Sequence, residues 1–98
     1  MDKFIGKYCV VRGDRSGVFA GTVTAQDGRE VTMADVRRLW RWQGATESFG
    51  LSATGTTDAN NCKFTISVSE VVILDAIEIV PCTEVAAASL KAVKEWTA

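Results

Sequence analysis

Residues 7–33, KYCVVRGDRSGVFAGTVTAQDGREVTM, predict the start of an antiparallel sheet. Within this stretch, Lys7–Arg12 and Val18–Thr24 are rich in β-branched and aromatic residues, which favour strands. Between them, Gly13–Gly17 has a glycine at each end, and glycine readily takes the positive φ angles that a tight loop needs. We therefore expect a β-hairpin over these residues.

A second turn is expected directly after this hairpin. The dipeptide Asp27-Gly28 is typical of a two-residue turn between antiparallel strands. The third strand should begin near Glu30 and run to Trp42, with a β-bulge at Ala34-Asp35.

The second half of the chain has weaker strand signals. Ala45–Ala53 predicts a short helix, which the turn-rich residues 54–61 would follow. Apolar and polar residues alternate over Cys62–Val68, as in a half-buried strand. Val71–Val80 is predicted to be one longer strand that ends at Pro81, because proline has no amide hydrogen to donate to the sheet.

The C-terminal residues predict a helix. Thr83 is the expected N-cap, and Glu84 lies in the first turn, where the helix dipole favours a negative charge. The alanine-rich segment Glu84–Val93 then forms the helix. The sequence thus predicts one α+β domain over residues 1–98, a small antiparallel sheet of about five strands with one C-terminal helix and a second short helix.

The composition favours a folded domain in the cytoplasm. Hydrophobic residues make up 47% of the chain and charged residues 23%, as in ordinary globular proteins. No apolar run approaches the roughly 18 residues that a membrane helix requires, and the N-terminus lacks a secretory pattern. The three cysteines are an odd number without CxxC spacing, which argues against a disulfide framework.

The net charge of −1 conceals an uneven distribution of charge. All six arginines lie between Arg12 and Arg41, so the first half of the chain is basic and the second half is acidic. Proteins that bind nucleic acid without specificity are usually basic over the whole domain. A local basic patch therefore favours a compact anionic ligand, and nucleic acid is the less favoured partner.

The residues that most enzymes use are missing. The chain has no histidine, so Ser-His-Asp and Cys-His arrangements and the commonest metal ligand are excluded. Phosphate-binding and dinucleotide-binding glycine motifs are also absent. We expect a binding protein that is not an enzyme and that needs neither a metal nor a cofactor.

The segment Arg37-Arg38-Leu39-Trp40-Arg41-Trp42 is the leading candidate for a ligand-binding site. In an extended strand, Arg38, Trp40 and Trp42 would share one face, and the other face would carry Arg37, Leu39 and Arg41. An indole can stack on a nucleotide base, and a guanidinium can pair with its phosphate. The alternative is that at least one of the two tryptophans belongs to the core.

Two further clusters are candidates for the same site. The loop over residues 12–17 offers Arg12, Arg15 and its backbone amides to a phosphate, although a solvated hairpin is the alternative. Asn60 and Asn61, with Lys63 beside them, could read the edges of a base, although asparagine-rich turns are common without any such role.

Several segments resemble a family of short proteins of tailed bacteriophages and prophages. The most specific part of the likeness is the Arg-Arg-x-Trp-x-Trp-x-Gly-Ala block, and the likeness spans most of the chain. The segments that carry it are Val11-Arg12, Ser16–Gly21, Arg37–Ala45, Asn61–Phe64 and Ala76–Thr83.

The resemblance implies the cytoplasm of an infected bacterium as the setting. Small phage proteins without catalytic residues include sponges, which sequester the cyclic oligonucleotide or cyclic ADP-ribose signals of CBASS and Thoeris defence and are typically homo-oligomers. By this functional analogy we expect a homo-oligomer that binds a small nucleotide-type signal and does not cleave it. The alternatives are an adaptor or inhibitor of a host protein, a nucleic-acid-binding accessory protein, and a virion component.

Overall fold

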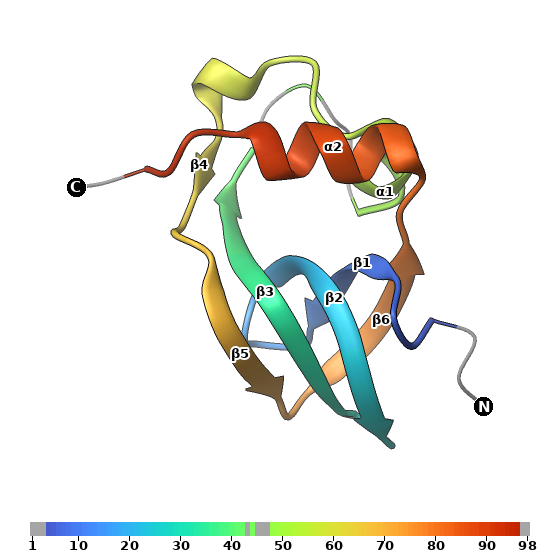
Figure 1. Ribbon diagram of the computed structural model, residues 1–98. Coiled ribbons are helices and arrows are strands. Elements are labelled where there is room, and N and C mark those ends of the chain that lie inside the picture. Colours follow the sequence, from blue (N-terminus) through green and yellow to red (C-terminus); the bar gives the residue numbers. More distant parts are fainter. Residues whose placement is uncertain (1–3, 43, 45–47, 97–98) are drawn as a thin grey trace.

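A computed structural model describes residues 4–42, 44 and 48–96 of the chain (Figure 1). Six strands, two α-helices and one 3-10 turn make up the fold of these residues. In chain order they are β1 (Tyr8–Gly13), β2 (Val18–Asp27), β3 (Glu30–Arg41), α1 (Ser48–Thr54), η1 (Ala59–Asn61), β4 (Lys63–Phe64), β5 (Val68–Ile73), β6 (Ala76–Pro81) and α2 (Glu84–Ala92).

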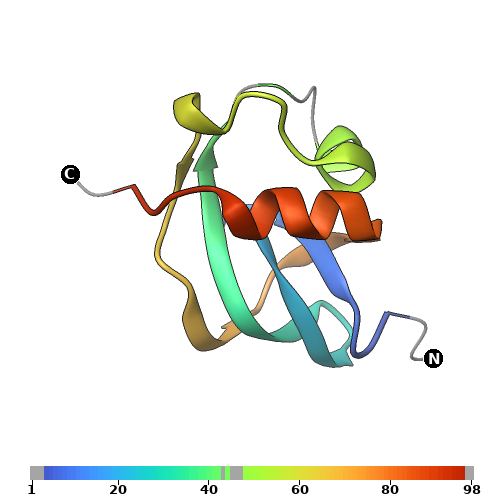
Figure 2. The ribbon, with the colours of Figure 1, turned by 45° about the horizontal axis from the view of Figure 1, so that its top comes forward.

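The six strands form one antiparallel sheet. Its order is β4-β3-β2-β1-β6, and β5 pairs with β3 beside β4. The long strand β3 can hold both neighbours because β5 pairs with its first half and β4 with its last residues. The sheet is strongly curved, and α2 lies across the ends of its strands (Figures 1 and 2). The predicted α+β class, with a C-terminal helix, is confirmed.

Both predicted hairpins are present. In the first, the amide of Gly13 donates to the carbonyl of Gly17 across the loop. In the second, Asp27 pairs with Glu30, so the turn itself consists of Gly28 and Arg29. Gly28 has a φ of 61°, which explains why glycine follows aspartate here.

The predicted bulge in β3 is also present. Ala20 pairs with Arg37 and Thr22 with Ala34, so β3 has one extra residue between these pairs. Asp35 takes up the irregularity with a φ of 48°, in the left-handed region that aspartate tolerates better than most residues. Beyond the bulge, the side chains of Val36 and Arg37 point to opposite faces of the sheet.

The two faces of the sheet pack against different cores. The core on the concave face contains Cys9, Val11, Phe19, Val23, Val31, Met33, Val36, Ile73 and Ala76. The core on the opposite face, under the helices, contains Val10, Ala20, Leu39, Leu51, Cys62, Phe64, Leu90 and Val93. Because both faces are covered, neighbouring residues such as Val10 and Val11 are both buried.

The two helices agree in part with those predicted from the sequence. The hydroxyl of Thr83 accepts from the amide of Ala86, so the predicted N-cap of α2 is confirmed. The helix α1 falls within the region predicted over Ala45–Ala53 and extends to Thr54, although residues 45–47 lie outside those that the structure describes. Neither α1 nor α2 has the length and apolar character needed to cross a bilayer.

Two strand predictions were wrong. Val71–Val80 is not one strand, because the chain turns at Leu74 and Asp75 and continues as a separate strand. The carboxylate of Asp75 accepts hydrogen bonds from Ser16 and Arg15, so this turn is held by the first hairpin loop. The strand predicted over Cys62–Val68 is interrupted, because only the two residues of β4 and the first residue of β5 are in strands there.

Candidate functional site

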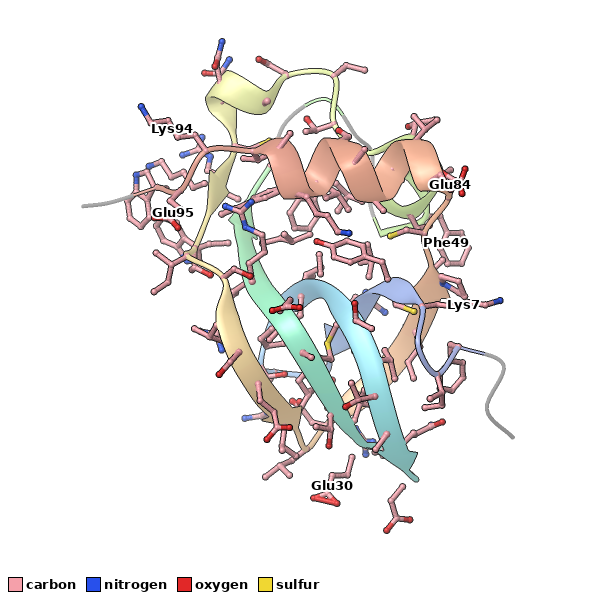
Figure 3. The ribbon with its side chains drawn as sticks, viewed as in Figure 1. Lys7, Glu30, Phe49, Glu84, Lys94 and Glu95 are labelled. Carbon is pink, nitrogen blue, oxygen red and sulfur yellow. The ribbon has the colours of Figure 1, made fainter. Side chains whose placement is uncertain are left out.

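A stacked pair of tryptophans lies where β3, β4 and the segment after α2 meet. The rings of Trp40 and Trp96 have centroids 4.9 Å apart and an interplanar angle of 24°. Phe64 brings the two segments together, because it pairs with Leu39 of β3 while its carbonyl accepts from the amide of Trp96 at 2.9 Å. Figure 3 shows the segment that follows α2, in which Lys94 and Glu95 are labelled, beside β4.

The ammonium group of Lys63 covers both indole rings. Its Nζ atom lies 5.4 Å from the ring centroid of Trp40 and 5.0 Å from that of Trp96. Both distances suit cation–π attraction. Lys63 is also the cross-strand partner of Arg41, and two like charges facing each other in a sheet are unfavourable. An anion bound here would offset this repulsion.

A cavity of about 350 Å³ opens beside the tryptophan pair. Its lining residues are Arg41, Asp58, Asn60, Asn61, Cys62, Lys63 and Trp96. We call this cavity, together with Trp40, the Trp40–Trp96 site. Two of the lining side chains are fixed to each other, because the Asn61 amide nitrogen donates to both carboxylate oxygens of Asp58, at 3.0 and 2.9 Å. Asn60 and Asn61 are both exposed.

The two tryptophans offer aromatic surface to solvent. Trp40 is 58% exposed and Trp96 37% exposed, which is unusual for residues of this size in a small domain. The exposed indole surface, two cations and two amide side chains therefore lie within one small region of the molecule.

The structure separates the other residues of the predicted Arg37–Trp42 segment. Arg37 is only 6% exposed and is hydrogen-bonded to the end of α2. Arg38 is exposed and lies over the ring of Phe19, 5.0 Å from its centroid. Trp42 is half-buried and packs against the core under the helices, as the core alternative expected of one tryptophan.

Arg12 and Arg15 also lie away from the Trp40–Trp96 site. Arg12 forms a long ion pair with Glu78, at 3.9 Å. Arg15 and Arg38 line a separate, more apolar cavity of about 490 Å³ along β5. Of the eight predicted site residues, the structure brings together Trp40, Asn60 and Asn61.

Trp96 is the main residue of the Trp40–Trp96 site that was not predicted from the sequence. Its local sequence contains no binding motif, and its contact with Trp40 depends on the long-range pairing of β3 with β4. Arg41 was placed on the face opposite Trp40. The register of β3 and β4 shifts between Leu39 and Arg41, and this irregularity breaks the simple alternation.

Most of the chain matches the model of one protein family. The sequence matches the family described as a domain of unknown function, DUF6948, over residues 6–90. The chain belongs to the DUF6948 family. The matched region of this DUF6948 domain includes Trp40, Asn60, Asn61 and Lys63, whereas Trp96 follows it. No curated protein matches the sequence.

Proposed function

We propose that this DUF6948 protein is a non-catalytic binding protein for a small nucleotide-type ligand, held at the Trp40–Trp96 site. The observation that carries the proposal is the exposed Trp40 ring, stacked on Trp96 under the Lys63 ammonium and beside a polar cavity. Aromatic stacking and a nearby cation are the two contacts that a base with a phosphate needs.

Each part of the site has a role in this proposal. The base stacks on the exposed surface of Trp40, a contact worth about 1–3 kcal/mol. Lys63 and Arg41 contact the phosphate. Asn60 hydrogen-bonds the edge of the base, since it is exposed and Asn61 is already bonded to Asp58 through its amide nitrogen.

The charge of the cavity favours a compact ligand. Arg41 and Lys63 are cationic, and Asp58 in the same lining is anionic. A nucleic-acid strand gains most of its affinity from many cations along its backbone. Two cations beside one carboxylate supply too few such contacts, so a small ligand is favoured over a polymer.

The resemblance to phage proteins supports a more specific form of the proposal. In an infected bacterium, a protein that binds a cyclic oligonucleotide or a cyclic ADP-ribose without cleaving it lowers the free concentration of that signal. Sequestration of a nucleotide-derived immune signal is therefore the biological role that we propose for the site.

Ligand release after heating tests this function. The purified protein is incubated with cyclic dinucleotides, cyclic trinucleotides and cyclic ADP-ribose, washed and heated, and the supernatant is analysed by mass spectrometry. We expect one class of ligand to be recovered intact, and to be lost with Lys63→Met but retained with Arg12→Met, a matched change at an exposed cation outside the site. A cleaved product, or no bound ligand, would contradict the proposal.

A second candidate function rests on a different surface. Exposed apolar side chains gather on and around β5, beside the cavity that contains Arg15 and Arg38. These apolar side chains are Ile66, Val68, Val72 and Leu74. Exposed apolar side chains that gather around one strand favour a protein interface. We propose that a second copy of the chain covers it; an adaptor or inhibitor would use the same surface to bind a host protein.

The oligomeric state distinguishes this surface from the ligand site. Leu74 is 72% exposed, so Leu74→Lys should fold normally. We expect light scattering to show an oligomer for the natural protein and a monomer for Leu74→Lys. A monomer in both cases would exclude the homo-oligomer while leaving the ligand-binding test unaffected.

A further inference from the structure

A second cavity lies between α2 and the sheet, and its residues are distinct from those of the Trp40–Trp96 site. Its volume is about 370 Å³. It is lined by Tyr8, Thr22, Asp35, Arg37, Ser67 and Lys91. We propose that this cavity binds a phosphate-sized oxyanion, independently of the ligand proposed above.

The guanidinium of Arg37 is the central observation. Its Nε atom donates to the carbonyl of Thr65 at 3.1 Å, and its Nη1 atom donates to the carbonyls of Leu90 and Val93 at 3.1 and 2.7 Å. Its Nη2 atom is buried and has no hydrogen-bond partner among the residues that the structure describes. Two N–H groups of a buried cation are therefore left without an acceptor.

Such an arrangement is costly unless something compensates for it. Leaving a buried charged donor unsatisfied costs more than leaving a neutral one. Burial accordingly lowers the pKa of Arg37, because desolvation disfavours its charged form. An anion in the cavity would supply the missing acceptor, and its charge would add to that of Glu95, which already favours the charged form of Arg37.

Four of the other lining residues also carry hydrogen-bond donors. The Nζ atom of Lys91 lies 4.7 Å from the centroid of the Tyr8 ring, so its charge is held at the cavity wall. Burial raises the pKa of Tyr8 to about 12, which keeps its hydroxyl protonated near neutral pH. Thr22 and Ser67 each add a hydroxyl.

The charges of the lining fit one small anion. Arg37 and Lys91 are cationic and Asp35 is anionic, which leaves one positive charge in excess. The C-terminus of a helix normally repels anions, because its last carbonyls carry partial negative charge. Here Arg37 already binds two of those carbonyls, from Leu90 and Val93, and so reduces the repulsion.

The cavity is preformed by several elements. Tyr8 comes from β1, Thr22 from β2, and Arg37 from β3 just after the bulge that places Asp35 at the cavity. Lys91 comes from the last turn of α2. Since the hydrogen bonds of Arg37 fix its side chain, little ordering is needed when an anion binds.

Titration with inorganic phosphate, and separately with sulfate, tests the proposal at constant ionic strength maintained with sodium chloride. Amide chemical shifts and the melting temperature are followed in the full chain. We expect saturable shifts at Tyr8, Thr22, Ser67 and Lys91, with a matching rise in melting temperature. Glycerol 3-phosphate in parallel distinguishes a free oxyanion, which would bind more tightly than the ester, from the phosphate group of a larger ligand.

Variants locate the binding. Lys91→Met should weaken phosphate binding about tenfold, as expected for loss of one charge-assisted contact. Thr22→Val is a second change in the lining that leaves Arg37 and its contacts with α2 in place. Lys94→Met, at an exposed lysine just beyond α2, should bind phosphate normally. Shifts that do not saturate, or that Lys63→Met abolishes while Lys91→Met does not, would overturn the proposal, and neither result bears on nucleotide binding.

Discussion

Trp40 of β3 stacks on Trp96, which follows α2, and the Lys63 ammonium lies over both rings. The contact joins two segments that are far apart in the chain, and a backbone hydrogen bond from Trp96 to Phe64 fixes it. The last described residues are therefore part of the candidate site.

The stacked indoles should give a circular dichroism signal of their own. Two indoles at 4.9 Å couple electronically, so we expect an exciton couplet in the far-ultraviolet spectrum. Trp96→Leu should abolish the couplet and lower the free energy of unfolding by about 1 kcal/mol, because a stacked aromatic pair is lost. Trp42→Leu is the control, since Trp42 packs elsewhere, against the core under the helices. A couplet that survives in Trp96→Leu would show that the stacking is absent in solution.

Arg37 and Arg38 are adjacent in sequence, but they should differ sharply in their effect on stability. Arg37→Met removes the hydrogen bonds to Leu90 and Val93 at the end of α2 and leaves buried carbonyls without donors. We expect a loss of about 2–4 kcal/mol in the free energy of unfolding, measured by urea denaturation.

The matched variant Arg38→Met should cost less than about 1 kcal/mol, because an exposed cation over one aromatic ring contributes little. Equal losses in the two variants would mean that Arg37 does not anchor α2 as the structure indicates.

Gly21 should tolerate no larger side chain. A Cβ atom at this position would lie 2.8 Å from both Cα and Cβ of Val36, which sits just after the bulge in β3. Gly21→Ala should therefore destabilise the domain by about 1–3 kcal/mol, as overpacking usually does. Thermal unfolding of the variant measures this effect, and an unchanged melting temperature would contradict the close approach of β2 and β3.

Asp75 should make stability depend on pH in the acid range. The Ser16 hydroxyl and the Arg15 amide donate to its carboxylate and hold its pKa below the ordinary value of 3.8. This stabilisation is present above pH 3.8 and is lost as the pH falls through the lower pKa of the folded state. Asp75→Asn should thus be less stable than the natural protein at neutral pH. The difference should shrink in acid; a constant difference between pH 7 and pH 2 would be inconsistent with this role.

The local signals in the sequence predicted much of the fold. Gly13–Gly17 and Asp27-Gly28 placed both hairpins, and Thr83 marked the start of α2, because these features depend on backbone preferences of a few residues. The break at Leu74 and Asp75 was not predictable in the same way. An unbroken apolar run hides a turn that is held from outside, by the hairpin loop at Ser16.

The candidate site was less predictable than the fold. Trp40, Asn60 and Asn61 were identified from residue type, because exposed aromatic and amide side chains suit a nucleotide. Trp96 was not, since its position depends on contacts between distant segments. Alternation along β3 also could not show that Arg37 would be buried under α2, because both faces of this sheet are covered.

Calorimetric titration of the natural protein and Trp40→Ala with the same cyclic nucleotide tests the central claim most directly. Trp40 is largely exposed, so this change should leave the fold intact. We expect the dissociation constant to rise by about 5-fold to 150-fold, which corresponds to a stacking contact of about 1–3 kcal/mol. Equal affinities in the two proteins, or no binding of any cyclic nucleotide by the natural protein, would contradict the claim that this ring holds the ligand.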